Sequence, residues 1–200
     1  MSQYGLEYEH HTYCVERAKK PSRRIFDTFR HNLPLLAQVP PGSTILDIAS
    51  GIGENGHDLQ WLGMRTISLD ISLHAQNLGQ KVFGNEKNNK RLVGDAIKLP
   101  FKDNSFDFAT SYDLLEHLVP NDIENTLEEL SRVVKGNRIF VKITPTEDTR
   151  NIDIDDTHIT KWKQSIWKDF FLSNGWSTQG DMTRKLFEKT IHGNFLLEKV

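Results

Sequence analysis

A cluster of small residues near position 50 has the composition and spacing of a site for a nucleoside-containing cofactor. Gly51, Gly53 and Gly56 are spaced as G-x-G-x-x-G directly after the apolar run Ile45–Ile48. Glycines let a ligand approach the main chain, and a turn from a strand into a helix presents backbone N–H groups and the positive end of the helix dipole. Asp70 ends the next apolar run, where one carboxylate can accept from both hydroxyls of a ribose. The alternative is a tight turn without a ligand.

Two kinds of cofactor fit these residues. The glycines with an acid about twenty residues later form the dinucleotide fingerprint, which predicts NAD. Asp47 lies on the first strand, just before the glycines, where it could meet the ammonium of an amino-acid moiety. Asp95 follows a third predicted strand, Arg91–Val93, where an acid could read an adenine edge. A fourth predicted strand, Phe106–Thr110, runs into the sequence SYDLLEHL.

The order of these motifs resembles the class I S-adenosylmethionine-dependent methyltransferases, in particular the type 11 small-molecule group. The resemblance covers about residues 44–144 and rests on LDIASGIGENG, SLDIS, VGDAIKLPF and SFDFATSYDLLEHL, followed by a helix and a strand at Arg138–Ile143. Ala49 departs from the family pattern, because many members have the first glycine of the loop there. The resemblance implies an α/β, Rossmann-like, seven-stranded and mostly parallel sheet, with helices on both faces and the last strand antiparallel.

The resemblance also implies S-adenosylmethionine as cofactor, with S-adenosylhomocysteine as product, and a set of residues that bind it. Asp47 and the loop from Ala49 to Gly53 are expected to hold the methionine part, Asp70 the ribose, and Asp95 with Ala96 the adenine. The complete implied set is Asp47, Ala49, Ser50, Gly51, Gly53, Asp70, Ile71, Asp95, Ala96 and Ser111. The last of these, at the end of the fourth strand, is expected near the methionine or the sulfonium.

Methyl transfer needs alignment of an acceptor lone pair behind the C–S bond, and an oxygen acceptor also needs a group that takes its proton. His117 and His158 are the candidates, because histidine titrates near neutral pH; Glu116 is a weaker one. His117 could instead pack against the cofactor, and His158 could instead shape a turn before Thr160, which is expected to cap the next helix. The acidic segment around residues 153–158 matches no metal-ligand spacing, so no metal is predicted.

Alternating helices and strands must bring these residues together. Strands and helices that alternate along the chain indicate a parallel sheet, and ligands bind at the carboxyl ends of its strands. We therefore expect Gly51, Asp70, Asp95 and Ser111 along one rim. Further helices are predicted near Leu73–Leu78, on the stripe from Ile123 to Val134, and around Trp162–Phe171. The last two strands are predicted at Trp176–Thr178 and Asn194–Leu197.

Length and composition predict one domain. Residues 1–43 are predicted to form a helical lid, and the resemblance implies that residues 44–200 form the Rossmann-like core. The basic side chains of the first segment could touch the substrate or form a solvated helix face. The net charge of −2 gives no general case for nucleic acid. A single cysteine and the absence of a long apolar run predict a cytoplasmic protein with no membrane span.

The sequence therefore predicts a methyltransferase acting at oxygen or nitrogen of a small-molecule, sugar or lipid-linked acceptor. An RNA or protein methyltransferase is a second interpretation, although no appended RNA-binding module or Asn-Pro-Pro-Tyr motif is present. An NAD-dependent reductase is a third, although Tyr112 is followed four residues on by Glu116 rather than by lysine. An inactive module that still binds the cofactor is a fourth.

Overall fold

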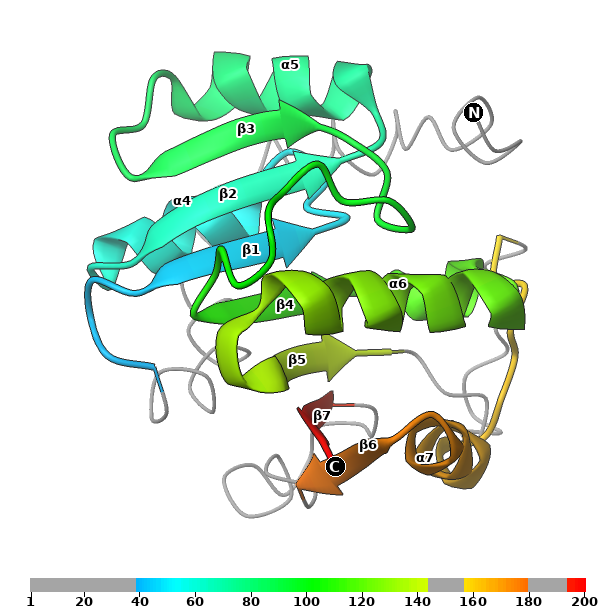
Figure 1. The fold of residues 1–200 in the computed structure, drawn as a ribbon. Helices are drawn as coiled ribbons and strands as arrows, with labels where there is room; N and C mark the ends of the chain where they lie inside the picture. Colours follow the sequence, from blue (N-terminus) through cyan, green and yellow to red (C-terminus); the bar gives the residue numbers. More distant parts are fainter. Residues whose placement is uncertain (1–38, 144–156, 180–193) are drawn as a thin grey trace, which may run out of the picture. The chain divides into compact units, whose positions relative to one another are not determined.

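Seven strands form one mixed sheet in a computed structural model that describes residues 39–143, 157–179 and 194–200 (Figure 1). The strand order is β3-β2-β1-β4-β5-β7-β6. The chain divides into two compact units, Met1–Ala96 and Ile97–Val200, and each is described by itself below. The predicted lid of residues 1–43 lies outside the described residues, apart from 39–43.

The first unit is built on three parallel strands. They are β1 (Thr44–Ile48), β2 (Arg65–Asp70) and β3 (Asn89–Val93), joined by helices α4 (Glu54–Trp61) and α5 (Leu73–Phe83). The apolar residues predicted for the first two strands are largely buried, since β1 and β2 lie inside the sheet. α4 packs against β2, and α5 packs against β2 and β3 (Figure 1).

The register places the carboxyl ends of these three strands at one edge. Ile48 pairs with Leu69, and Asp70 pairs with Val93. The segments that follow β1, β2 and β3 therefore start side by side, because parallel strands in register end together. This edge of the first unit carries the glycine loop, Asp70 and the segment leading to Asp95.

The second unit continues with strands β4 (Phe108–Tyr112), β5 (Arg138–Lys142), β6 (Trp176–Gln179) and β7 (Asn194–Lys199). β4 and β5 are parallel, whereas β7 is antiparallel to both β5 and β6. The predicted fold class is thus confirmed: a Rossmann-like, mostly parallel sheet of seven strands, interleaved with helices and ending on an antiparallel strand.

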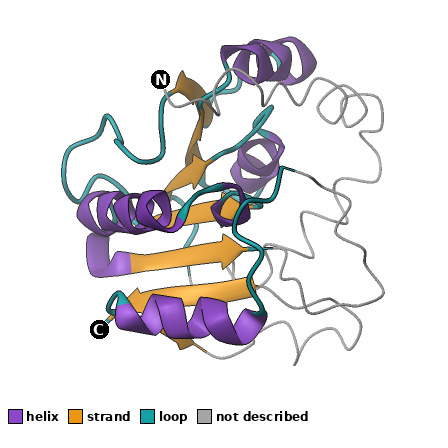
Figure 2. Cartoon of the chain, turned by 90° about the vertical axis from the view of Figure 1, so that its right-hand side faces the viewer, coloured by secondary structure: helices purple, strands orange, loops and turns teal. Residues whose placement is uncertain are grey.

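Helices α6 (Pro120–Val133) and α7 (Gln164–Ser173) accompany these strands, with short 3-10 turns at η2 (Leu115–His117) and η3 (Lys135–Asn137). The stripe predicted for α6 is buried, so that helix turns one apolar face to the interior of its unit. α7 packs against β6 (Figure 2).

Two predicted boundaries are wrong. β4 begins at Phe108 instead of Phe106, because the main chain of Phe106 bonds instead to Val133 and Lys135 at the end of α6. The prediction that Thr160 caps the following helix is also wrong, since α7 begins at Gln164. The Thr160 hydroxyl instead donates to the carbonyl of Leu118 at 2.6 Å, which joins its segment to the turn after β4.

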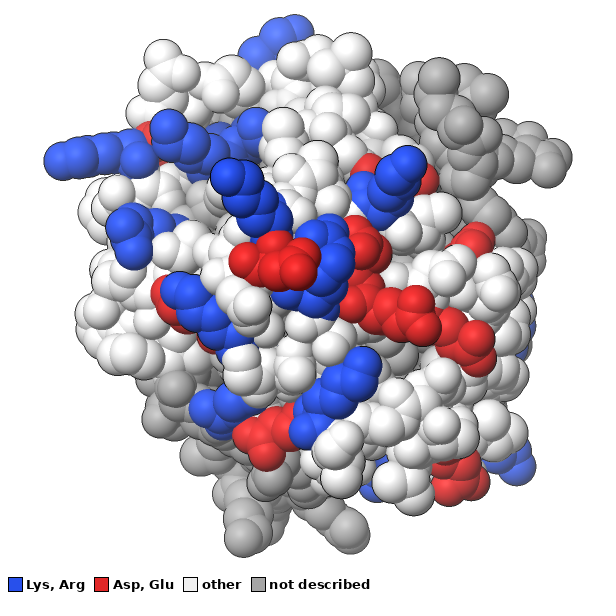
Figure 3. All heavy atoms as spheres, viewed as in Figure 1, with Lys and Arg blue, Asp and Glu red and all other residues white. Residues whose placement is uncertain are grey.

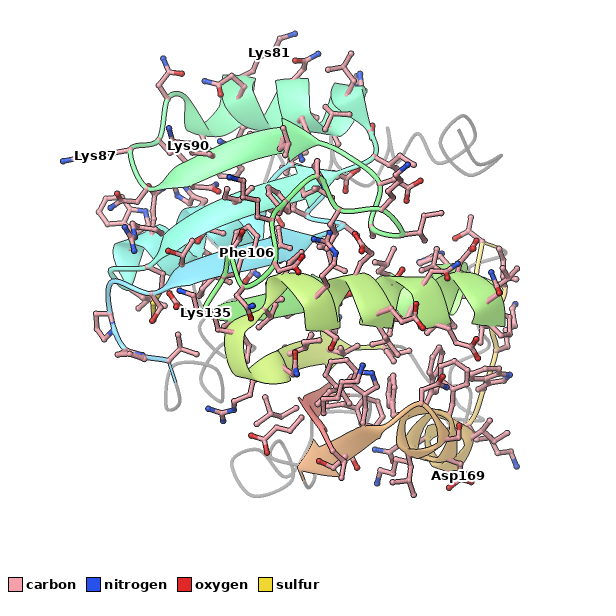
Figure 4. All side chains as sticks on the ribbon, in the orientation of Figure 1. Lys81, Lys87, Lys90, Phe106, Lys135 and Asp169 are labelled. Atoms are coloured by element: carbon pink, nitrogen blue, oxygen red, sulfur yellow. The ribbon has the colours of Figure 1, made fainter. Side chains whose placement is uncertain are left out.

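Charges of both signs are mixed on the face shown in Figure 3, which carries no single-sign patch among its described residues. Lys81, Lys87 and Lys90 project from α5, β3 and the loop between them (Figure 4). Lys135 forms an ion pair with Asp107 at 3.0 Å. This face of the described chain therefore has the ordinary mixture of surface charges.

Candidate cofactor site and histidine pair

The three glycines of the loop after β1 have three different structural roles. Gly51 has φ +56°, and no described residue lies within 4 Å of the place where a Cβ would stand, so this part of the chain leaves open space beside the loop. Gly53 is the residue before α4 and also has a positive φ. Gly56 packs so closely on β2 that a Cβ there would collide with the side chains of Ser68 and Asn89. A ligand can approach the main chain at Gly51, while Gly56 brings the helix onto the sheet.

Asp70 is bound to the glycine loop through its side chain. One carboxylate oxygen accepts from the backbone N–H of Gly51 at 2.8 Å, and the other accepts from the N–H of Ser72 at 2.8 Å. Burial raises the pKa of Asp70 above its usual value, and the hydrogen bonds from Ser72 and Gly51 offset this only in part. Each oxygen retains a second acceptor position, so the carboxylate can still receive hydroxyl donors.

Helix α5 begins against the same loop. Ser72 caps this helix, with its hydroxyl accepting from the N–H of Ala75 at 3.1 Å. One turn into the helix, the buried amide of Gln76 donates to the hydroxyl oxygen of Ser50 at 3.1 Å and to the carbonyl of Gly51 at 3.2 Å. Neither Ser72 nor Gln76 was predicted as a site residue from the sequence. The N-cap pattern of a serine before a helix could have identified Ser72, whereas a glutamine inside a helix carries no such signal.

Asp47 is buried on β1, one residue before the strand ends. The side-chain amide of Asn55, on α4, donates to its Oδ1 at 2.9 Å. Burying a carboxylate is costly unless it receives hydrogen bonds, and Asn55 supplies one. The structure therefore places Asp47 under the start of the loop, as expected from the sequence.

Asp95 and Ala96 follow β3 at the same edge of the first unit. The N–H of Gly94 donates to the backbone oxygen of Asp70 at 2.9 Å. That bond extends the pairing of β2 and β3 by one step and sets Asp95 directly beyond it. The predicted residues of the first unit thus lie on three adjoining segments.

A buried ion pair lies beside Gly53 and supports the glycine loop there. Arg91 of β3 pairs with Glu86 at 2.6 Å, and both side chains are almost fully buried. The Arg91 Nε donates to the carbonyl of Ile52 at 3.4 Å, and its guanidinium would be 3.3 Å from a Cβ at Gly53. Glu86 also accepts from Gln60, His57 and Asn89. Burial raises the pKa of Glu86, but the hydrogen bonds from His57, Arg91 and Asn89, with the charge of Arg91, bring it below its usual value.

Ser111 lies fully buried on β4 in the second unit. Its hydroxyl oxygen has no hydrogen-bond partner among the residues that the structure describes. Two residues later, Asp113 adopts φ +50° and its carboxylate pairs with Lys142 of β5 at 2.6 Å. A buried hydroxyl without a partner calls for a water or a ligand.

The two histidines singled out as candidate bases lie against each other in the second unit. The rings of His117 and His158 meet edge to face, with 4.7 Å between their centroids. His117 Nδ1 is 3.2 Å from the carbonyl oxygen of Thr157. The hydroxyl oxygen of Thr157 lies 3.1 Å from the same nitrogen, so Thr157 holds the His117 ring through both its main chain and its side chain. The main-chain N–H groups of Ile159 and Thr160 donate to the carbonyl of Glu116 at 2.9 Å, which joins the two segments.

Within the described ranges, no group of three His, Cys, Asp or Glu side chains could hold a metal ion. In the same part of the chain, no helix has both the length and the apolar character needed to cross a membrane.

The geometry described above agrees with what comparisons with known proteins show. Residues 46–141 match the family described as Methyltransferase domain. A demethylmenaquinone methyltransferase of Corynebacterium kroppenstedtii is 35% identical over 102 residues, which are 50% of this chain and 42% of that protein. The chain thus spans less than half the length of the curated relatives it matches.

Two solved structures share the fold at low sequence identity. One is a complex between the Haloferax volcanii Trm112 methyltransferase activator and a protein described as a methyltransferase; it covers 96% of this chain and 95% of the matched chain, with TM-score 0.73 and 20% identity. The other is a Haemonchus contortus phosphoethanolamine N-methyltransferase with phosphoethanolamine and S-adenosylhomocysteine, which covers 94% of this chain and 47% of that one, with TM-score 0.64 and 17% identity. At these identities the likeness concerns the fold.

Proposed function

Because residues 46–141 match the family described as Methyltransferase domain, we propose that this chain is an S-adenosylmethionine-dependent methyltransferase acting on a small-molecule, sugar or lipid-linked acceptor. The observation that carries the proposal is the loop at Gly51. Its open side faces no atom of the described residues within 4 Å, and its main chain is bound to the carboxylate of Asp70. A loop of this kind can receive a ligand while an adjacent acid accepts from a ribose.

The residues of the first unit fit the parts of S-adenosylmethionine. Asp47, buried below the start of the loop, suits the ammonium group, and the backbone from Ala49 to Gly53 suits the rest of the methionine part. The carboxylate of Asp70 suits the ribose hydroxyls, with Ile71 beside it. Asp95 and Ala96, which follow the extended pairing of β2 and β3, suit the adenine. Ser111, with its unpartnered buried hydroxyl, is assigned to the same cofactor.

S-adenosylmethionine supplies an electrophilic sulfonium methyl group when bound, so the chain's own residues mainly align the acceptor and take a proton. We assign the proton to the pair of His117 and His158. Thr157 holds the ring of His117 through its Nδ1, and the ring of His158 lies against it. A base within hydrogen-bond reach of an acceptor hydroxyl contributes about 10²–10⁴ in rate.

A small acceptor is supported by one comparison. The curated relative named above is a demethylmenaquinone methyltransferase, and its name gives a quinone as the acceptor rather than a nucleic acid or a protein. Transfer to an oxygen or a nitrogen is consistent with a histidine base.

Isothermal titration calorimetry with S-adenosylhomocysteine, S-adenosylmethionine and NAD tests the cofactor. We expect binding of the first two and none of NAD. Binding of NAD alone would overturn the proposal in favour of a reductase. A screen with S-adenosylmethionine labelled on its methyl group, over quinol, phenol, sugar and amine acceptors, then tests transfer, and cofactor binding without transfer to any acceptor class would favour an inactive binding module.

A further inference from the structure

The side chain of Gln76 forms hydrogen bonds to both the carbonyl group of Gly51 and the side chain of Ser50. It lies on α5 with only 5% of its surface exposed, and its side-chain nitrogen donates to the Ser50 hydroxyl oxygen at 3.1 Å and to the Gly51 carbonyl at 3.2 Å. Asp70 binds the N–H of Gly51 from the other side. Ser50 and Gly51 are therefore fixed by two side chains outside the loop.

The orientation of the Gln76 amide follows from its partners. The carbonyl of Gly51 can only accept, so the amide nitrogen must face it; the flipped amide would set two oxygens against each other. Both N–H groups of the amide are used on the loop. The remaining Oε1 is buried and has no hydrogen-bond partner within the described residues.

This orientation determines what the Ser50 hydroxyl can do. Its oxygen accepts from Gln76, so its hydrogen is left to donate elsewhere. Among the described residues, the Ser50 hydroxyl donates to no group. Ser50 is only partly buried and lies next to the open side of Gly51. A hydroxyl donor at this position suits a ligand group that only accepts.

We propose that Gln76 is a positioning residue that orients the Ser50 hydroxyl as a donor to the carboxylate of the amino-acid part of the cofactor. The inference rests on the proposed function, and it adds a selectivity: Gln76 and Ser50 recognise the amino-acid part and not the nucleoside. An apolar side chain would fill the same place on α5 without burying an unpartnered carbonyl oxygen, so packing alone does not explain a glutamine here.

Binding of two ligands to matched variants tests the inference. S-adenosylhomocysteine carries the carboxylate, and adenosine does not. Gln76→Leu and Ser50→Ala should each weaken S-adenosylhomocysteine about tenfold or more, as expected for a hydrogen bond to a charged group. Both should leave adenosine binding within about threefold. The double variant should lose little beyond either single one, because Gln76 acts through Ser50.

Gln80→Leu is the matched control, since Gln80 lies one turn further along α5 and, among the described residues, its amide bonds only to the Asn85 side chain. It should bind both ligands as the wild type does. Equal weakening of both ligands by Gln76→Leu, or no weakening of either, would overturn the inference. If Gln76→Leu does not fold, Ser50→Ala alone decides by the same comparison. Failure of the wild type to bind S-adenosylhomocysteine would overturn the proposed function itself. If the wild type binds it, the variants test only the role of Gln76 and Ser50.

Discussion

The carboxylate of Asp70 accepts a hydrogen bond from the backbone N–H of Gly51 at 2.8 Å, so the acid assigned to the ribose also holds the loop assigned to the methionine part. One side chain therefore connects the end of β2 to the turn after β1. Substituting Asp70 should disturb loop and ligand together. An alanine variant removes the whole side chain, whereas protonation changes only the charge of the carboxyl group.

The affinity for S-adenosylhomocysteine should fall as the pH drops through the pKa of Asp70, which burial raises above 3.8. Ribose hydroxyls donate to the ionised carboxylate, so the ligand binds the deprotonated form, and the loss should begin at higher pH than for an ordinary aspartate. Calorimetry from pH 7 downward measures it. Asp70→Asn should bind more weakly at pH 7 and lack this step. The same pH dependence in both proteins would contradict the ribose assignment.

Ala49→Gly should stabilise the protein. Ala49 has φ +52°, a backbone region that costs a residue with a Cβ about 1–2 kcal/mol. Glycine lowers the free energy of unfolding by about 0.5–1 kcal/mol, because its unfolded state is more flexible. We therefore expect a net increase of about 0.5–1 kcal/mol in the free energy of unfolding measured by urea denaturation. Asn104→Gly, at φ +54°, is the control and should gain less, because asparagine tolerates this region. A loss of stability in Ala49→Gly would show that the backbone at Ala49 is not strained.

Gly51→Ala should abolish cofactor binding at a moderate cost in stability. The new Cβ meets no protein atom but enters the open side of the loop, and φ +56° adds strain of about 1–2 kcal/mol. Gly175→Ala is a matched control, because Gly175 has φ +76° and equally open surroundings after α7. Both variants should lose similar stability, and only Gly51→Ala should lose S-adenosylhomocysteine in calorimetry. Normal binding by Gly51→Ala would mean that the ligand does not lie on this loop.

His158→Ala should keep its melting temperature and lose turnover by about a hundredfold or more, the usual effect of removing a general base. His117→Ala should lose turnover and some stability, because it also removes the contact with Thr157. Methyl transfer to the acceptor found by screening and thermal denaturation measure the two effects. His74→Ala, on the exposed side of α5, should change neither. Wild-type turnover in His158→Ala would assign that histidine a structural role.

Glu86→Gln should destabilise the protein by about 3 kcal/mol at pH 7, because it leaves the buried guanidinium of Arg91 without its partner charge. The pKa of Glu86 is lowered, so its contribution is complete above the unfolded value of about 4.5 and is lost as the pH falls through the lower folded value. The free energies of unfolding of the wild type and of Glu86→Gln, measured by urea denaturation, should converge towards pH 3. Asp107→Asn, which breaks the exposed pair with Lys135, should cost at most about 1 kcal/mol at pH 7. A pH-independent difference for Glu86→Gln would contradict the ionic explanation.

The strands of the first unit were predictable because burial on both sides leaves continuous apolar runs such as Ile45–Ile48. A glycine directly after a helix is an equally local signal, and Gly63 after α4 and Gly175 after α7 both have the positive φ that favours glycine there. The beginning of α7 was not predictable in the same way. Thr160 has the chemistry of a cap, but its hydroxyl bonds to Leu118, a partner 42 residues away. The local sequence does not show that a residue far along the chain will take the hydroxyl that could have capped the helix.

Some residues of the candidate site were likewise predictable from the sequence, and others were not. Motif order identified the residues of the glycine loop, Asp70 and Asp95, because each follows a strand directly. It did not identify Gln76, whose role depends on how α5 lies on the loop, nor the support that Arg91 gives to the Ile52 carbonyl. His117 and His158 were proposed separately, and their ring contact emerges only from the folded chain. Side chains that act on a neighbouring segment's backbone leave no spacing pattern in the sequence.

The peptide groups on both sides of Gly51 are held before any ligand arrives, its N–H by Asp70 and its C=O by Gln76. A loop fixed in this way has little conformational freedom left to lose, so little of the binding free energy is spent on ordering it. The conformation that binds the ligand is then already the populated one in the free protein. The apparent affinity is therefore not reduced by a small fraction of binding-competent molecules. Association with this loop should therefore follow a single encounter step, and differences in affinity between related ligands should reside mainly in how fast they leave.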